Sequence, residues 1–133
     1  MVQVALALLA DYANVSREGK LNILGIFDRL SVQGLPAIHP QMQLVLVLEA
    51  DRGDADREHK LGIELIDADG VKLLSMAGDL KFGLPPAGEQ VRINHIIQIN
   101  NLKFEHHGSY EFKIFINNEV RKNVPLSVAE IKK

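Results

Sequence analysis

The alternation of apolar and polar side chains restricts the fold of this chain more than any other feature. The segment YEFKIFIN, residues 110–117, carries an apolar side chain at every second position from Tyr110 to Ile116. Successive side chains of a β-strand point to opposite faces, so this period places one face in a core and the other in solvent. Short segments with the same period recur from Leu21 onward, separated by turn residues. The chain is therefore predicted to be all-β.

Two segments predict how particular strands are used. MQLVLVLEA, residues 42–50, is nearly all apolar, which is typical of a central strand that is buried on both faces. HKLGIELID and VKLLSMAG are separated by residues 67–70, and Gly70 can adopt the left-handed conformation that a tight hairpin needs. We therefore expect a central strand at the first segment and a hairpin at the second.

Two further segments carry apolar residues in phase. LNILGIFDRLSV, residues 21–32, is predicted to form one apolar face from Leu24, Ile26, Leu30 and Val32. VRINHIIQI, residues 91–99, is predicted to place His95 on the same inward face as its in-phase apolar residues. A histidine in that position is more typical of the core than of a ligand site.

The strand-like segments number about eight, at the spacing typical of a sandwich. At 133 residues the chain has the size of one ordinary domain with a single core. We predict one domain, residues 1–133, folded as an antiparallel β-sandwich with Greek-key or jelly-roll-like connections; a partly open β-barrel is the alternative. Pro125 lies inside VRKNVPLSV and lacks an amide hydrogen, which predicts an edge strand.

The composition excludes several classes of function. The chain has 15 Lys and Arg against 17 Asp and Glu, interspersed, so it offers no broad electropositive surface and no nucleic-acid partner is expected. It contains no cysteine, which excludes disulfides, thiolate metal ligands and cysteine nucleophiles. An apolar run at residues 4–10 ends at Asp11, too early for a membrane span, and lacks the basic start of a signal peptide. We expect a cytoplasmic protein without membrane contact.

The segment HHGSY, residues 106–110, is the first candidate site. On a strand, the adjacent His106 and His107 would point to opposite faces and not easily bind one metal ion. Ser109 lacks the Gly-x-Ser-x-Gly motif of a nucleophile elbow. Gly108 and Tyr110 instead have the spacing of a tyrosine corner, in which the tyrosine hydroxyl binds the backbone a few residues upstream. We therefore predict a structural corner here, with no catalytic residue and no cofactor.

The acidic loop DRGDADREH, residues 51–59, is the second candidate site. Several carboxylates in one flexible loop suit a hard cation such as Ca²⁺. The loop does not fit the EF-hand spacing, and Arg52 and Arg57 partly neutralise it. We expect a solvated loop, with divalent-metal binding by Asp51, Asp54 and Asp56 as the alternative.

The most specific motif lies in LLADYANVSREGKLNILGIFDRL, residues 8–30. Its distinctive positions are Ala10, Asp11, Ala13, Asn14, Val15, Gly19, Lys20, Leu21, Asn22, Gly25, Ile26, Phe27 and Asp28. With them the segment resembles the ADxANVSxxGKLNxxGIFD-like opening of a functionally uncharacterised family of small bacterial and phage proteins. The resemblance implies a β-sandwich and no established activity, so it transfers no catalytic residue.

Polar residues of this segment cluster around one strand connection in the sequence. They are Asp11, Asn14, Lys20, Asn22 and Asp28. Asp and Asn side chains hydrogen-bond the nearby backbone and hold turns, so a structural turn network is the simpler interpretation. The functional alternative is a small polar recognition patch on rigid strands.

These observations favour a non-enzymatic β-sandwich that serves as an interaction or structural module. The edge strands of an open sandwich need protection, and pairing with a second copy is a common form of it, so we expect a homo-oligomer, a dimer in the simplest case, or another protein as partner. The resemblance adds a phage-related role by analogy. The alternative function is a small-ligand or divalent-ion-binding domain that uses the loops at one end of the sandwich.

Overall fold

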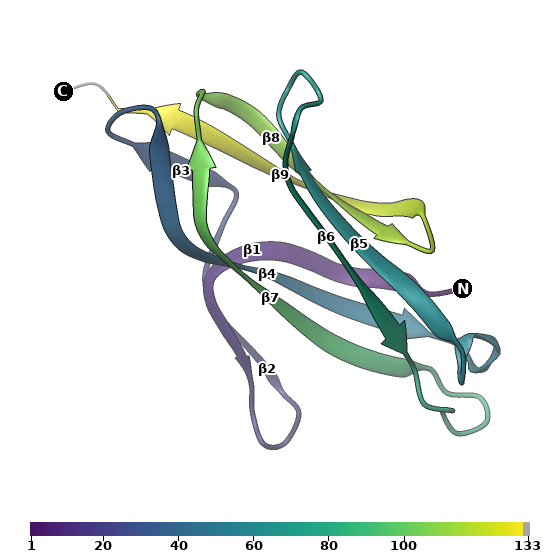
Figure 1. Ribbon diagram of the computed structural model, residues 1–133. Coiled ribbons are helices and arrows are strands. Elements are labelled where there is room, and N and C mark those ends of the chain that lie inside the picture. Colours follow the sequence, from purple (N-terminus) through teal and green to yellow (C-terminus); the bar gives the residue numbers. More distant parts are fainter. Residues whose placement is uncertain (132–133) are drawn as a thin grey trace.

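The computed structural model describes residues 1–131 and confirms the all-β prediction. These residues form nine strands in two sheets, and one short 3₁₀ turn, η1 (Arg52–Asp54) (Figure 1). The strands are β1 (Gln3–Val15), β2 (Leu21–Phe27), β3 (Arg29–Val32), β4 (Ala37–Ala50), β5 (Glu58–Ile66), β6 (Lys72–Lys81), β7 (Val91–Phe104), β8 (Gly108–Ile116) and β9 (Glu119–Glu130).

The chain passes repeatedly between the two sheets. The four-stranded sheet has the order β2-β1-β4-β7, and the five-stranded sheet has the order β3-β9-β8-β5-β6. The antiparallel β-sandwich is confirmed, with one exception among the strand pairs of residues 1–131: β3 runs parallel to β9. The chain leaves β2 at Asp28 and enters the other sheet in the direction of β9. A two-residue period does not report which strands pair or in which direction.

The core lies between the sheets and contains side chains from both. Leu44, Leu46 and Leu48 of β4 are fully buried, as are Phe112 and Ile114 of β8. Burying one such side chain stabilises the fold by about 1.5–3 kcal/mol. β4 lies between β1 and β7, so the predicted central strand is confirmed. The alternation in YEFKIFIN is confirmed as well.

Two hairpin turns follow the turn residues of the sequence. Gly70 has a φ of 83° between β5 and β6, as predicted. Asn117 and Asn118 have φ values of 51° and 69° between β8 and β9. Asparagine tolerates this left-handed conformation better than most residues, which explains its use at a two-residue turn.

The predicted apolar face of residues 21–32 is wrong in its first half. Leu24 and Ile26 are 67% and 63% exposed, whereas Leu30 and Val32 pack against the core. The first two belong to β2 and the last two to β3, which is in the other sheet. In addition, Gly25 has a φ of 72°, which interrupts the regular pleat of β2.

The prediction that the strand containing Pro125 is an edge strand is also wrong. β9 lies between β8 and β3 in the five-stranded sheet. However, β3 pairs only with the segment from Ser127 to Glu130. Pro125 therefore has β8 on one side, where it is paired with Glu111, and lies outside the ladder with β3 on the other. The short β3 explains how an internal strand tolerates a proline.

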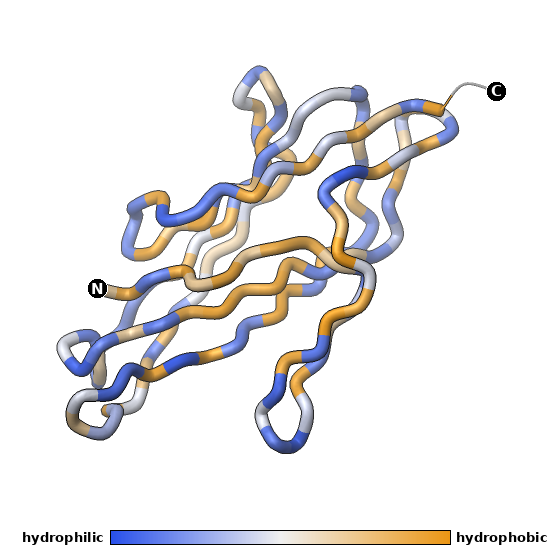
Figure 2. Tube along the Cα trace, turned by 180° about the vertical axis from the view of Figure 1, so that it is seen from behind, coloured by the Kyte–Doolittle hydropathy of each residue, from blue (hydrophilic) through white to orange (hydrophobic). Residues whose placement is uncertain are grey.

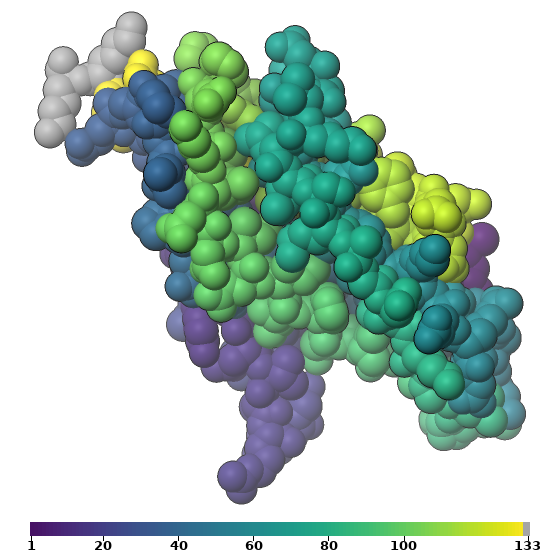
Figure 3. Space-filling model, viewed as in Figure 1, coloured from purple at the N-terminus to yellow at the C-terminus, as the bar shows by residue number. Residues whose placement is uncertain are grey.

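The C-terminal part of β1, the turn after it and the whole of β2 form a projecting hairpin, residues 10–27 (Figure 1). In the space-filling view it stands clear of the rest of the molecule (Figure 3). Seen from behind, both of its strands carry apolar positions and its tip is hydrophilic (Figure 2). A hairpin of this kind exposes apolar side chains that the body of the sandwich does not cover.

Candidate functional site

The projecting hairpin carries the main group of exposed large apolar side chains on neighbouring strands. Tyr12, Val15, Leu24 and Ile26 are between 46% and 67% exposed. Tyr12 lies opposite Leu24 in the ladder between β1 and β2. β2 is an edge of the four-stranded sheet, so among residues 1–131 no strand lies along one side of its backbone. Apolar side chains therefore flank an open strand edge.

The tip of the hairpin is closed by local hydrogen bonds. The amide of Ser16 donates to the carbonyl oxygen of Lys20 at 2.8 Å, and the Ser16 hydroxyl accepts from the amide of Lys20 at 3.1 Å. Gly19 has a φ of 85°, which fits the tight connection. Two residues before Ser16 and two after Lys20, at the paired positions Asn14 and Asn22, the Asn22 side-chain amide donates a hydrogen bond to Asn14 Oδ1 at 3.0 Å. These contacts fix the register of β1 and β2 up to the tip.

Gly25 of β2 lies close to Asp11 of β1. The carboxylate of Asp11 lies against it, so that a Cβ at position 25 would overlap Asp11 Oδ2 and lie 2.9 Å from its Cγ. Before this point, Ile23 faces a second apolar cluster around Val45, on the outer side of the sheet. Leu24 is not part of either cluster and remains exposed.

The polar residues of the signature do not form one patch. Asn14 and Asn22 contact each other, and Asp11 lies at Gly25. Lys20 immediately precedes β2 and Asp28 immediately follows it. At a rise of about 3.3 Å per residue, the eight steps from Lys20 to Asp28 across this seven-residue strand separate them by roughly 26 Å. Their clustering in the sequence thus reflects the two ends of one extended strand.

The acidic loop is organised by Asp54 as a structural residue. Its carboxylate accepts a hydrogen bond from the Asp51 amide at 3.0 Å and lies 2.8 Å from the N-terminal amine and 3.6 Å from the Arg57 guanidinium. Burial by itself raises the pKa of Asp54, but the hydrogen bonds from the N-terminal amine and the Asp51 amide outweigh it and hold the pKa below its ordinary value. Asp54 thus serves as the N3 residue of the capping box that begins η1.

The other two aspartates of the loop do not join Asp54 in a metal site. Asp51 accepts a hydrogen bond from the Gln90 side chain at 2.9 Å, and Asp56 is in the left-handed region with a φ of 58°. Within residues 1–131, no group of three or more His, Asp or Glu side chains is arranged to hold a metal ion.

His59 is a buried polar residue that the sequence analysis missed. It is 2% exposed and packs edge-on against Phe82, with ring centroids 5.6 Å apart. Its Nε2 lies 2.7 Å from the carbonyl oxygen of Asp54, and its Nδ1 lies 3.0 Å from the side-chain amide of Asn117. A carbonyl oxygen only accepts, so Nε2 carries the proton and Nδ1 accepts from Asn117. His59 thereby joins the acidic loop to the β8–β9 turn; its alternation with Leu61 and Ile63 was the available sequence signal.

The segment HHGSY forms the bend into β8. The hydroxyl of Tyr110 donates a hydrogen bond to the carbonyl oxygen of His106 at 2.6 Å, which is the arrangement of a tyrosine corner. Gly108 has a φ of 132°, a value that glycine adopts readily and other residues rarely do. Burial raises the pKa of the Tyr110 hydroxyl, and the hydrogen bond to His106 opposes this only in part. His39 of β4 does not belong to this bend; it packs against Phe27, with ring centroids 6.1 Å apart.

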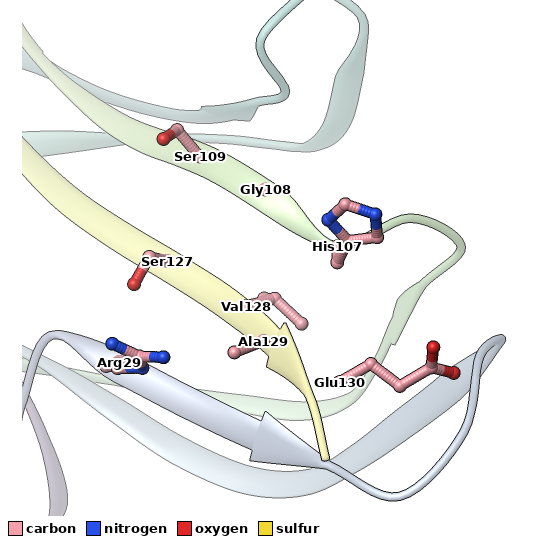
Figure 4. Close-up of a pocket in the computed structure, with 8 residues that line it drawn as sticks. All are labelled: Arg29, His107, Gly108, Ser109, Ser127, Val128, Ala129 and Glu130. Atoms are coloured by element: carbon pink, nitrogen blue, oxygen red, sulfur yellow. The ribbon is translucent and has the colours of Figure 1, made fainter. Parts of the chain in front are cut away.

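A shallow hollow lies beside this bend, on the outer side of β3, β9 and β8 (Figure 4). It has a volume of about 570 Å³. Ser109 pairs with Ser127, and Ser127 pairs with Arg29, so these three residues form one row across the strands. His107 and Glu130 line the same hollow. The row offers two hydroxyl groups and one guanidinium to a polar partner.

A second hollow, of about 630 Å³, lies at the same end of the sandwich. It is lined by the β5–β6 turn, the start of β6 and the end of β7, with Lys103 and His106 among its polar residues. Asp67 also lines it, but its Oδ1 accepts hydrogen bonds from the amides of Asp69 and Val71, both at 2.9 Å. Part of the polar lining thus stabilises the turn.

His95 lies on the inward face, as the alternation predicts. It is paired with Leu46 across the ladder between β4 and β7 and is half-buried. Desolvation by this burial lowers its pKa below the ordinary value of 6.5. The neutral imidazole is therefore the form that the fold favours.

Comparison with known proteins places the chain in a family. The model of the family described as "Family of unknown function (DUF6941)" matches residues 5–129. A comparison with curated proteins found no match.

Among solved structures, the chain is similar to one titled "Pseudomonas fluorescens alkylpurine DNA glycosylase AlkC bound to DNA containing an abasic site analog", at 13% sequence identity and a TM-score of 0.48. The alignment covers 96% of this chain but 30% of that one. In the described part of the chain, no helix is long and apolar enough to cross a membrane.

Proposed function

The chain belongs to DUF6941, a family of unknown function. We propose that it is a non-enzymatic module that binds another protein chain, in the simplest case a second copy of itself. The observation that carries the proposal is the projecting hairpin, where Tyr12, Leu24 and Ile26 are exposed beside the open edge of β2. Such an edge with apolar side chains is a template for strand pairing.

Burial of the exposed side chains is the physical reason to expect a partner. Soluble proteins rarely leave large apolar side chains grouped at an open strand edge without a partner. Leu24 and Ile26 alone are 67% and 63% exposed, and each side chain taken from water contributes up to about 1.5–3 kcal/mol. A strand from a partner offers this burial together with backbone hydrogen bonds.

Known contacts of the titratable groups support a non-enzymatic role. Asp54 caps η1, Tyr110 holds the corner at His106, and His59 joins two loops. Shifted pKa values mark candidates for catalysis, but structural ion pairs and hydrogen bonds shift them as well. For Asp54, the hydrogen bonds from the N-terminal amine and the Asp51 amide explain the lowered pKa.

For the cellular setting we propose a bacterial cytoplasm and a structural or accessory role in a phage-related assembly. The resemblance of residues 8–30 supports the bacterial and phage-related parts of this proposal. A role in an assembly agrees with a small sandwich whose main exposed feature is a strand edge, since edges extend sheets from one subunit to the next.

A second candidate function is the binding of a small polar ligand. The hollow of about 630 Å³ that contains Lys103 and His106 favours it, because its size is within the range of ligand sites. A ligand held there would stabilise the folded state and raise the melting temperature.

Sedimentation velocity over a range of protein concentrations, with a thermal-shift screen of the same sample, tests both functions. A concentration-dependent dimer or larger species supports the interaction module. The interaction module is overturned if the protein is a monomer at every concentration and also retains no protein partner in an affinity pull-down. In that case, a rise in melting temperature with a metabolite or a metal ion supports ligand binding.

A further inference from the structure

β2 lacks the usual protection of an edge strand. Its sequence is LNILGIF, without a charged residue or a proline. Natural edges are commonly blocked by lysine, proline or an inward charge, because otherwise they pair with another chain. The one irregularity of β2 is Gly25, which presents no side chain to a neighbouring strand.

The charges at the two ends of β2 are opposite and equally spaced. Lys20 and Asp28 are both exposed, and each lies four residues from Leu24. In residues 1–131 neither is part of an ion pair: the six salt bridges found there involve other residues. The segment from Lys20 to Asp28 is therefore complementary in charge to itself when it is reversed.

An antiparallel pair of such segments brings these charges together. A two-fold axis at Leu24 sets Leu24 of one copy opposite Leu24 of the other, as in an isologous interface. The same register sets Lys20 of each copy opposite Asp28 of its partner, so that two ion pairs form. A shift by one residue separates the charges and turns each side chain to the other face.

The surroundings of Asp28 leave room for the tip of a second hairpin. A hollow of about 320 Å³ is lined there by Ile26, Phe27 and Asp28 together with Val124 and Pro125. Its lining is largely apolar, so the arriving chain would cover Ile26 at the same time. Beside it, the part of β9 that contains Pro125 is not paired with β3.

We propose that two copies of the chain associate through antiparallel pairing of β2 about a two-fold axis at Leu24, with Lys20 of each copy bound to Asp28 of the other. This inference rests on the proposed function and specifies its interface. The two four-stranded sheets then form one continuous sheet of eight strands across the dimer.

Charge reversal tests the register. Lys20→Asp and Asp28→Lys each set like charges opposite one another twice in a dimer of identical copies, and we expect each to raise the dissociation constant at least about tenfold. Mixing the two variants in equal amounts restores opposite charges at both ends, so a heterodimer of near wild-type affinity is expected. Lys122→Asp and Asp79→Lys are matched controls at exposed positions outside β2.

A cysteine at the axis gives an independent measurement. The chain has no cysteine, so Leu24→Cys introduces a single thiol. Residues directly opposite in an antiparallel pair have Cα atoms about 4.5–5.5 Å apart, which is within the range of a disulfide. On mild oxidation the variant is expected to form a covalent dimer much faster than Val71→Cys, a control at a residue that is 59% exposed.

The outcomes separate the interface from the function. If the wild type self-associates but neither the mixing of charge variants nor Leu24→Cys behaves as expected, the β2 interface is wrong while the interaction module stands. If the wild type stays monomeric at all concentrations, the dimer is overturned. Circular dichroism of each variant establishes that it is folded, and Lys20→Gln with Asp28→Asn replace any reversal that is not.

Discussion

The hydroxyl of Tyr110 donates a hydrogen bond to the backbone carbonyl oxygen of His106, 2.6 Å away. Tyr110 is 5% exposed and packs edge-on against Phe104, with ring centroids 5.0 Å apart. The bond therefore joins the loop after β7 to a ring that is fixed in the core. This relationship stabilises the bend that carries both His106 and His107.

Removal of the Tyr110 hydroxyl is expected to weaken the fold without changing its shape. Tyr110→Phe keeps the ring in the core but leaves the His106 carbonyl without this donor, so the free energy of unfolding should fall by about 0.5–1.5 kcal/mol. Urea denaturation measures the change. Tyr12→Phe is the control, because Tyr12 is 47% exposed; an equal loss in both variants would contradict a special role of the corner.

Gly25 is expected to tolerate no side chain. Gly25→Ala combines a φ of 72° with an overlap on the Asp11 carboxylate, and we expect a loss of about 1–3 kcal/mol in the free energy of unfolding. Adding Asp11→Ala should recover the part due to the overlap but not the part due to the backbone. Gly78→Ala is the control, since position 78 has open space for a Cβ; a similar loss there would argue against this explanation.

Acidification is expected to destabilise the protein through His95. The folded state lowers the pKa of His95 below 6.5, so the unfolded state binds the proton more tightly. The stabilising effect is complete above pH 6.5 and is lost as the pH falls through the folded pKa. Melting temperatures between pH 8 and pH 5 should decline less for His95→Gln than for the wild type, and parallel profiles would exclude His95 as the cause.

Asp54 is expected to make the stability of the fold depend on pH below about 3.8, a more acidic range than that of His95. Its pKa is held below the ordinary value of 3.8, so its contribution is present above that value and is lost as the pH falls through the folded pKa. Asp54→Ala also removes the acceptor of the Asp51 amide and should cost about 1–3 kcal/mol at neutral pH. Chemical denaturation at pH 7 and pH 3 checks both statements. The control variant Asp56→Asn keeps a residue type that tolerates the φ of 58° at this position, and it should have a much smaller effect than Asp54→Ala at pH 7.

The candidate site was predictable in its residues but not in its geometry. The signature singled out Lys20 and Asp28, yet the sequence placed them in one cluster, because it does not show that β2 separates them as an extended strand. Leu24 and Ile26 were assigned to an inward face by their period. They are exposed because they lie on the projecting hairpin, and β3 continues in the other sheet, which no local pattern reports.

The sequence by itself determined the strands, the turns and the main core, because alternation, left-handed turn residues and buried apolar runs act over a few neighbouring residues. Tyr110, Gly70 and the central segment 42–50 are examples. Only the tertiary structure decided the partners of each strand, the parallel pairing of β3 with β9, and the open edge of β2. Strand pairing joins residues far apart in the chain, and its free energy depends on which faces become buried when the two sheets meet.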